Sequence, residues 1–96
     1  MFERRELDAI LRIYGRMVAR GEWRDYAIDG LTDRAVFSVY RRSSEHPLYR
    51  IEKTPDNARK QGAWAILAPG GMILKRGQEL SSVLRYFDRK RLSVVG

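Results

Sequence analysis

The chain has a helical pattern at each end and only strand patterns between them, and this order most constrains its fold. Apolar residues recur three and four positions apart over Glu3–Arg20, and again over Gln78–Asp88. Each pattern carries one apolar stripe, so each helix buries one side. The segments between them are short and joined by polar turns, which favours an antiparallel meander of neighbouring strands.

Four to five segments between the helices have the β-branched and aromatic composition of strands. The predicted strands are Trp23–Ile28, Ala35–Arg41, Leu48–Lys53, Ala63–Ala68 and Met72–Lys75. Turns are expected at Asp29-Gly30 and Pro69-Gly70-Gly71, and Gly77 is expected to end the last strand. We therefore predict an α+β fold in which both helices pack on one face of the sheet. The other face meets water or a partner.

The length of 96 residues predicts a single domain over 1–96, with a core over about residues 3–88. Residues 89–96 form a charged tail, and Leu92–Val95 is expected to add an edge strand or to fray. Trp23 and Trp64 are expected to lie in the core or at its edge. The chain has no Cys, which excludes disulfides, a thiol nucleophile and a Cys zinc site.

No apolar run approaches the ~20 residues of a membrane span, and the first residues lack the apolar core of a signal peptide. A cytoplasmic protein that does not bind membranes is therefore expected.

Lys plus Arg number 19 and Asp plus Glu number 12, which gives a net charge of +7. Residues 22–33 are acidic, and the excess of positive charge lies in the middle and towards the C-terminal end. Such a balance suits nucleic acid or an acidic protein, or is simply a solvated surface.

Basic and aromatic residues alternate around two neighbouring predicted strands and the loop after them. Arginine and lysine bind phosphate, and an aromatic ring on a sheet face can stack on a base. The structural alternative is that Tyr40 and Tyr49 pack in or near the core while the arginines are solvated. The candidate binding residues are Tyr40, Arg41, Arg42, Arg50, Arg59 and Lys60.

Three other features carry weaker chemical signals. Arg76 and Gly77 precede the second helix, whose first amides could hold an anion, although the glycine equally serves a turn. His46 is the single imidazole and lies beside Glu45, but no serine stands in a nucleophile-elbow motif. Aspartates at 25, 29 and 33 lack the alternation of a calcium loop, so we interpret them as turn and solubility residues and predict no metal site.

Long blocks of the sequence resemble a known bacterial family. They include Gly21–Tyr26, Asp33–Val39, Pro47–Lys53, Arg59–Trp64 and Gly71–Gly77. These blocks are similar to the domain-of-unknown-function family numbered 2794, found mainly in alphaproteobacteria, over about residues 4–88. The resemblance implies a small bacterial protein with no assigned activity, cofactor or catalytic residue.

The residues and the resemblance together predict a non-catalytic binding module without a cofactor. The first hypothesis is nucleic-acid binding through the basic surface. The alternative is a protein-interaction or homodimerisation module that uses the exposed sheet face or the edge strand Trp23–Ile28. Each is a hypothesis about a surface, because the sequence alone does not show which residues share one face.

Overall fold

The computed structural model describes residues 1–42 and 46–95, and the side chains of residues 1–42 and 46–88. Along the chain, one α-helix precedes the strands and one follows them, as predicted. The elements in chain order are α1 Arg4–Ala19, β1 Asp25–Gly30, β2 Ala35–Tyr40, β3 Tyr49–Lys53, the short 3-10 helix η1 Pro55–Asn57, β4 Trp64–Leu67, β5 Ile73–Gly77 and α2 Leu80–Val95.

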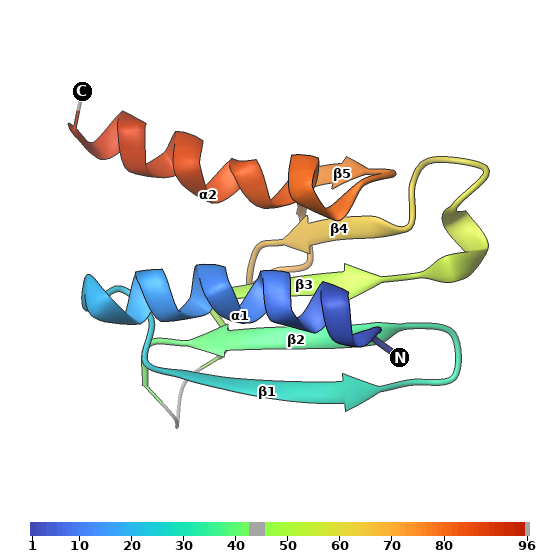
Figure 1. Ribbon diagram of the computed structural model, residues 1–96, viewed down its shortest axis with the longest axis horizontal. Helices are drawn as coiled ribbons and strands as arrows, with labels where there is room; N and C mark the ends of the chain where they lie inside the picture. Colours follow the sequence, from blue (N-terminus) through green and yellow to red (C-terminus); the bar gives the residue numbers. More distant parts are fainter. Residues whose placement is uncertain (43–45, 96) are drawn as a thin grey trace.

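The five strands form one antiparallel sheet in the order β1-β2-β3-β4-β5. Both helices lie side by side on the same face, with α1 over the β2–β3 side and α2 over the β4–β5 side (Figure 1). Successive strands point in opposite directions, so the β2–β3 loop and the β4–β5 turn lie at one end of the sheet. The β1–β2 turn and the β3–β4 loop lie at the other. The predicted α+β architecture is confirmed.

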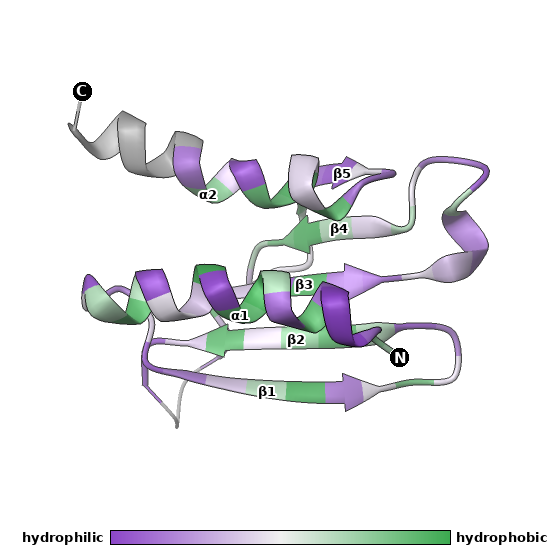
Figure 2. Ribbon diagram, viewed as in Figure 1, coloured by the Kyte–Doolittle hydropathy of each residue, from purple (hydrophilic) through white to green (hydrophobic). Residues whose placement is uncertain are grey.

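The core lies between the sheet and the two helices. From the sheet it contains alternate residues of the central strands, such as Phe37, Ile51 and Ile66, all fully buried. Ile10 of α1 and Val83 of α2 are also fully buried, so the apolar stripes predicted from the 3.6-residue period do face the sheet. Trp23 and Trp64 are buried, as expected. Figure 2 shows apolar residues along the central strands and on the helices where these meet the sheet.

Three predicted boundaries are wrong. Asp29 and Gly30 belong to β1 instead of a turn, because Gly30 pairs with Ala35 and extends the ladder. The last strand does end at Gly77, but it extends two residues past the predicted Lys75, because Gly77 pairs with Trp64. Residues 92–95 do not form an edge strand, because α2 continues to Val95 instead of ending near Asp88. No Gly or Pro interrupts the chain between Gln78 and Gly96, so nothing stops the helix earlier.

Aromatic side chains attach α1 to the outer strand of the sheet. The Tyr14 ring meets the Tyr26 ring edge-on at 4.8 Å, and Tyr26 stacks on Phe37 at 4.9 Å. The Tyr14 hydroxyl donates a hydrogen bond to the Arg24 carbonyl at 2.9 Å. Burial, and then the charge of Asp25, raise the pKa of Tyr14 above its ordinary value. This contact fixes the position of α1 along β1.

Candidate functional site

The face of the sheet that carries no helix is the candidate site, and we call it the open face. Strand alternation and the pairing register determine its members. Phe37, Val39, Ile51 and Ile66 point to the helices, so their neighbours in each strand point the other way. The residues of the open face are Asp25, Ala27, Asp29, Val36, Ser38, Tyr40, Arg50, Glu52, Ala65, Leu67, Ile73 and Arg76.

Arg50 occupies the middle of the open face. It pairs with Ser38 on one side and with Leu67 on the other, so small and apolar side chains flank it. Its guanidinium extends towards the β4–β5 turn, since a Cβ added at Gly71 in that turn would lie 3.9 Å from Nη2. The Arg50 Nε is buried and has no hydrogen-bond partner among the described residues. The Arg50 Nη groups form no hydrogen bond or ion pair with the described residues and are not among the buried unpaired atoms, so they, and not the buried Nε, are the donors available to an external anion.

Beside Arg50, an ion-pair network neutralises part of the open face. Arg34 Nη1 donates to Glu52 Oε1 at 3.1 Å, and Arg34 Nη2 donates to Asp33 Oδ2 at 3.2 Å. The Glu52 side chain is only 8% exposed, so the arginine supports a carboxylate that water hardly reaches. The hydrogen bond from Arg34 holds the pKa of Asp33 below its ordinary value, and Asp33 in turn raises the pKa of Arg34. Arg34 is thus engaged within the protein.

Replacing Arg34 by alanine is expected to destabilise the fold by roughly 1–3 kcal/mol, because Glu52 would keep a buried charge without its partner. Urea unfolding of R34A measures this loss. In the Glu52→Gln background the same replacement should cost clearly less, since no buried carboxylate then remains. Equal losses in both backgrounds would contradict the role assigned to the pair.

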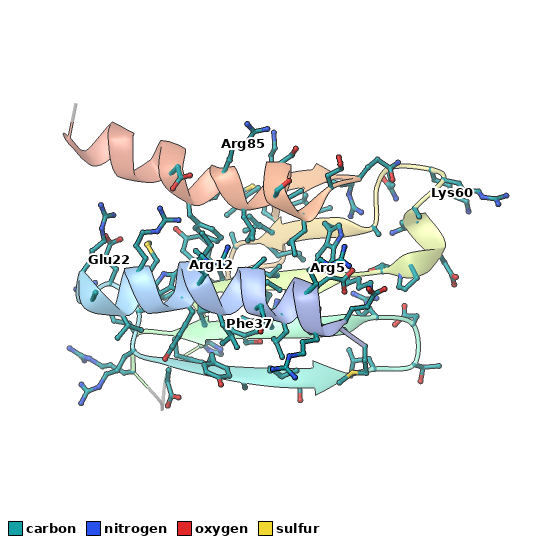
Figure 3. The ribbon with its side chains drawn as sticks, viewed as in Figure 1. Arg5, Arg12, Glu22, Phe37, Lys60 and Arg85 are labelled. Carbon is teal, nitrogen blue, oxygen red and sulfur yellow. The ribbon has the colours of Figure 1, made fainter. Side chains whose placement is uncertain are left out.

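The structure divides the six predicted binding residues between the two ends of the sheet. Arg41 and Arg42 directly follow β2, at the end where the β2–β3 loop lies. Arg59 and Lys60 lie in the β3–β4 loop at the opposite end, and Figure 3 shows Lys60 there, far from the end of β2. All four are exposed. Arg41 and Arg42 therefore lie at the same end of the sheet as Tyr40, and Arg59 and Lys60 do not.

The two tyrosines considered for base stacking differ in position. Tyr40 is half-buried on the open face at the end of β2, diagonally next to Arg50. Tyr49 faces the helices, with its ring 5.2 Å from the Phe87 ring and 6.2 Å from the Trp23 ring. Tyr49 therefore belongs with the core, which was the structural alternative, whereas Tyr40 lies on the open face.

Arg76 does not join the start of α2. Its Nη1 donates to the Gly62 carbonyl at 3.2 Å, and strand alternation places its side chain on the open face. Gly77 faces the other side, where an added Cβ would lie 3.1 Å from Val83 of α2. The structure thus separates the two residues of the predicted anion site. It adds the Arg76 guanidinium to the open face instead.

The remaining chemical candidates acquire no partners. His46 is exposed and makes no hydrogen bond or ion pair within the described part of the chain, and Glu45 lies outside that part. Among the side chains that the structure describes, no group of three His, Asp or Glu is arranged for a metal ion. No helix within residues 1–42 and 46–95 is long and apolar enough to cross a membrane.

Sequence reasoning missed the internal pairing of Arg34 with Glu52. Arg34 comes directly before β2, and Glu52 alternates with buried Ile51 in β3. The alternation did place Glu52 on the face opposite to Ile51. The burial of Glu52 was not predictable from this alternation, because it depends on the neighbouring strands and on the Arg34 side chain from the β1–β2 turn.

Comparison with known families gives a match over most of the chain. The model of a family described as "Protein of unknown function (DUF2794)" matches residues 1–84. The matched range contains the whole sheet, the open face and the first turn of α2. No curated protein and no solved structure gives a match. The family description assigns no activity, so a function must be argued from the open face itself.

Proposed function

We propose that this chain, which belongs to the DUF2794 family of unknown function, binds single-stranded nucleic acid on its open face. The observation that carries the proposal is Arg50, an arginine of the central strand whose Nη groups form no hydrogen bond or ion pair with the described residues. No helix covers this arginine, and Tyr40 lies diagonally beside it.

Phosphate contacts would come from the arginines near one end of the sheet. Arg50 lies on the open face, and Arg41 and Arg42 extend from the end of β2. A guanidinium donates two parallel hydrogen bonds to a phosphate, a geometry that lysine lacks. A net charge of +7 also attracts a polyanion over a distance of about one Debye length, near 10 Å at 0.1 M salt.

A base contact would come from Tyr40. Diagonal neighbours on one sheet face have Cα atoms about 7–8 Å apart, so one strand of nucleotides can meet both Tyr40 and Arg50. Stacking on an aromatic ring contributes on the order of 1–3 kcal/mol per base and needs unpaired bases. This favours a single strand over a duplex.

The acidic outer strand limits where the ligand can lie. Asp25 and Asp29 project from β1 on the open face and repel phosphate. The basic side chain Arg50 comes from β3 instead, whereas Arg76 lies near the β3–β4 loop and donates to the Gly62 carbonyl there. The nucleic acid is therefore expected to cross β2–β4 near the β2–β3 loop and to avoid β1.

Affinity for a fluorescent single-stranded oligonucleotide should fall about 20-fold between 50 and 200 mM salt if three phosphates are neutralised. The double variant Arg41→Ala/Arg42→Ala should bind more weakly and show a flatter salt dependence, because it lacks two of those contacts. Fluorescence anisotropy at both salt concentrations measures the affinity and the salt slope.

The matched control is Arg59→Ala/Lys60→Ala, which removes the same charge at the other end of the sheet and should bind nearly as well as the natural protein. A Tyr40→Ala variant should lose the preference for single over double strands. Equal losses in the two double variants would mean attraction by net charge alone. Absence of binding at 50 mM salt would overturn the proposal and favour an acidic protein as the partner.

A further inference from the structure

Within residues 1–42 and 46–95, the outer edge of β1 has backbone groups that no strand satisfies. β1 pairs with β2 on one side only. Leu31 N–H donates to the Arg34 carbonyl, which identifies the odd-numbered residues of β1 as those that bond to β2. The N–H and C=O groups of Tyr26, Ile28 and Gly30 therefore point away from the sheet. The outward Tyr26 N–H donates to the Asp25 side chain at 3.0 Å, which is a local substitute for a partner strand.

On the helix side, this edge is apolar and incompletely covered. Tyr26 and Ile28 pair with the buried Val39 and Phe37, yet they remain 40% and 37% exposed. Tyr14 of α1 touches Tyr26, so the helix flank that carries Tyr14 borders the same strip. Leu11 and Val18 lie on that flank by helical spacing, and Val18 is exposed. An added strand could bury apolar side chains here.

On the open-face side, the same edge is acidic. Asp25 and Asp29 are both exposed and lie four residues apart in β1, with Ala27 between them. Neither forms an ion pair with a described side chain. A local negative charge on a protein of net charge +7 is suited to a cationic group of a partner.

We infer that β1 accepts an extended basic and apolar peptide segment of another protein as a sixth strand of the sheet. Opposite residues in paired strands share a face, so β1 specifies the pattern of the segment. Residues opposite Tyr26 and Ile28 are apolar, and those opposite Asp25 and Asp29 are Lys or Arg. The segment therefore reads basic, apolar, any residue, apolar, basic. This inference concerns a different surface from the nucleic-acid proposal and does not depend on it.

A second copy of β1 pairs poorly with the same edge in the antiparallel register centred on Ala27. Antiparallel pairing of two β1 strands about Ala27 would place Asp25 of each copy opposite Asp29 of the other. Like charges directly opposite each other are destabilising in a sheet. Charged side chains on an edge strand commonly prevent such self-pairing. The charge pattern thus selects a basic partner strand.

The test uses a short capped fluorescent peptide with the central sequence Lys-Val-Thr-Val-Lys. It should bind the full chain with a Kd between about 10 μM and 1 mM. A peptide with Glu at both Lys positions should bind on the order of tenfold more weakly. The Asp25→Lys/Asp29→Lys variant should reverse this preference. In the natural protein, the amide NMR signals of Tyr26, Ile28 and Gly30 should shift most.

Two controls separate the edge from general attraction. Asp56→Lys/Glu79→Lys changes the net charge by the same amount away from β1 and should keep the preference for the Lys peptide. Ile28→Pro removes an outward N–H without removing a bond to β2, so it should abolish peptide binding while circular dichroism shows a folded sheet. Absence of binding at 1 mM, equal binding of both peptides, or shifts confined to other strands would overturn the inference. Unchanged oligonucleotide affinity with peptide bound would support two separate surfaces.

Discussion

Replacing Gly62 by alanine is expected to destabilise the fold by roughly 2–6 kcal/mol, as the sum of backbone strain and collision. Gly62 is buried and has φ +100°, a conformation that side chains with a Cβ rarely adopt. An added Cβ would lie 2.4 Å from both the carbonyl carbon and the carbonyl oxygen of Gly77. These are backbone atoms of β5, and Gly77 itself packs on Val83, so neither side can move away easily.

Thermal unfolding followed by circular dichroism measures this effect, and the midpoint should fall by at least about 10 °C. Two other glycines serve as matched controls. Gly71 has φ +93° but nothing closer than the end of Arg50, so G71A isolates the cost of the backbone conformation. Gly15 lies inside α1 with open space around it, so G15A should stabilise by up to about 1 kcal/mol. If G62A and G71A had the same midpoint of thermal unfolding, the collision of the added Cβ with the Gly77 backbone would not contribute to the loss of stability.

Replacing Phe37 by alanine is expected to cost about 3–5 kcal/mol of stability. Phe37 is fully buried in the middle of β2, and its ring stacks on Tyr26 and meets Tyr14 edge-on at 6.3 Å. The smaller side chain would leave a cavity between α1 and the sheet, where Figure 3 shows Phe37. The helix would also lose part of its contact with β1.

Urea unfolding measures this loss directly. The midpoint urea concentration should fall, while the dependence of the unfolding free energy on urea concentration should stay the same. Met72→Ala is the control, since Met72 is 67% exposed in the β4–β5 turn and its truncation should change stability by less than about 0.5 kcal/mol. A loss below 1 kcal/mol for F37A would mean that the core does not depend on this ring. It would also weaken the argument that Tyr14 and Tyr26 hold α1 through Phe37.

The elements were predictable because their signals are local. The stripe that contains Ile10 and the one that contains Val83 each follow a helical period, and the alternation in Ala35–Tyr40 follows a strand period. The boundaries were less predictable because they depend on pairing. Gly30 and Gly77 are turn formers by composition, yet both have ladder partners, Ala35 and Trp64. A partner strand outweighs the intrinsic preference of a single residue.

The division of the candidate binding residues between two ends of the sheet was implied by the meander itself. The loop after β2 and the loop after β3 must leave from opposite ends of an antiparallel sheet. Arg41 and Lys60 therefore could not share one end, although they lie close in sequence. The sequence prediction considered their spacing along the chain and not the direction of the strands.

The sequence by itself determined the class of fold, because the helix and strand periods specify which residues each element buries. It also determined the net charge of +7 and the acidic segment over residues 22–33. Only the tertiary structure decided which charges act together. Pairing of Arg34 with Glu52, the buried Nε of Arg50 and the unpaired edge of β1 each depend on strands that are distant in sequence. Burial and hydrogen bonding between such strands are set by register, which a local pattern does not contain.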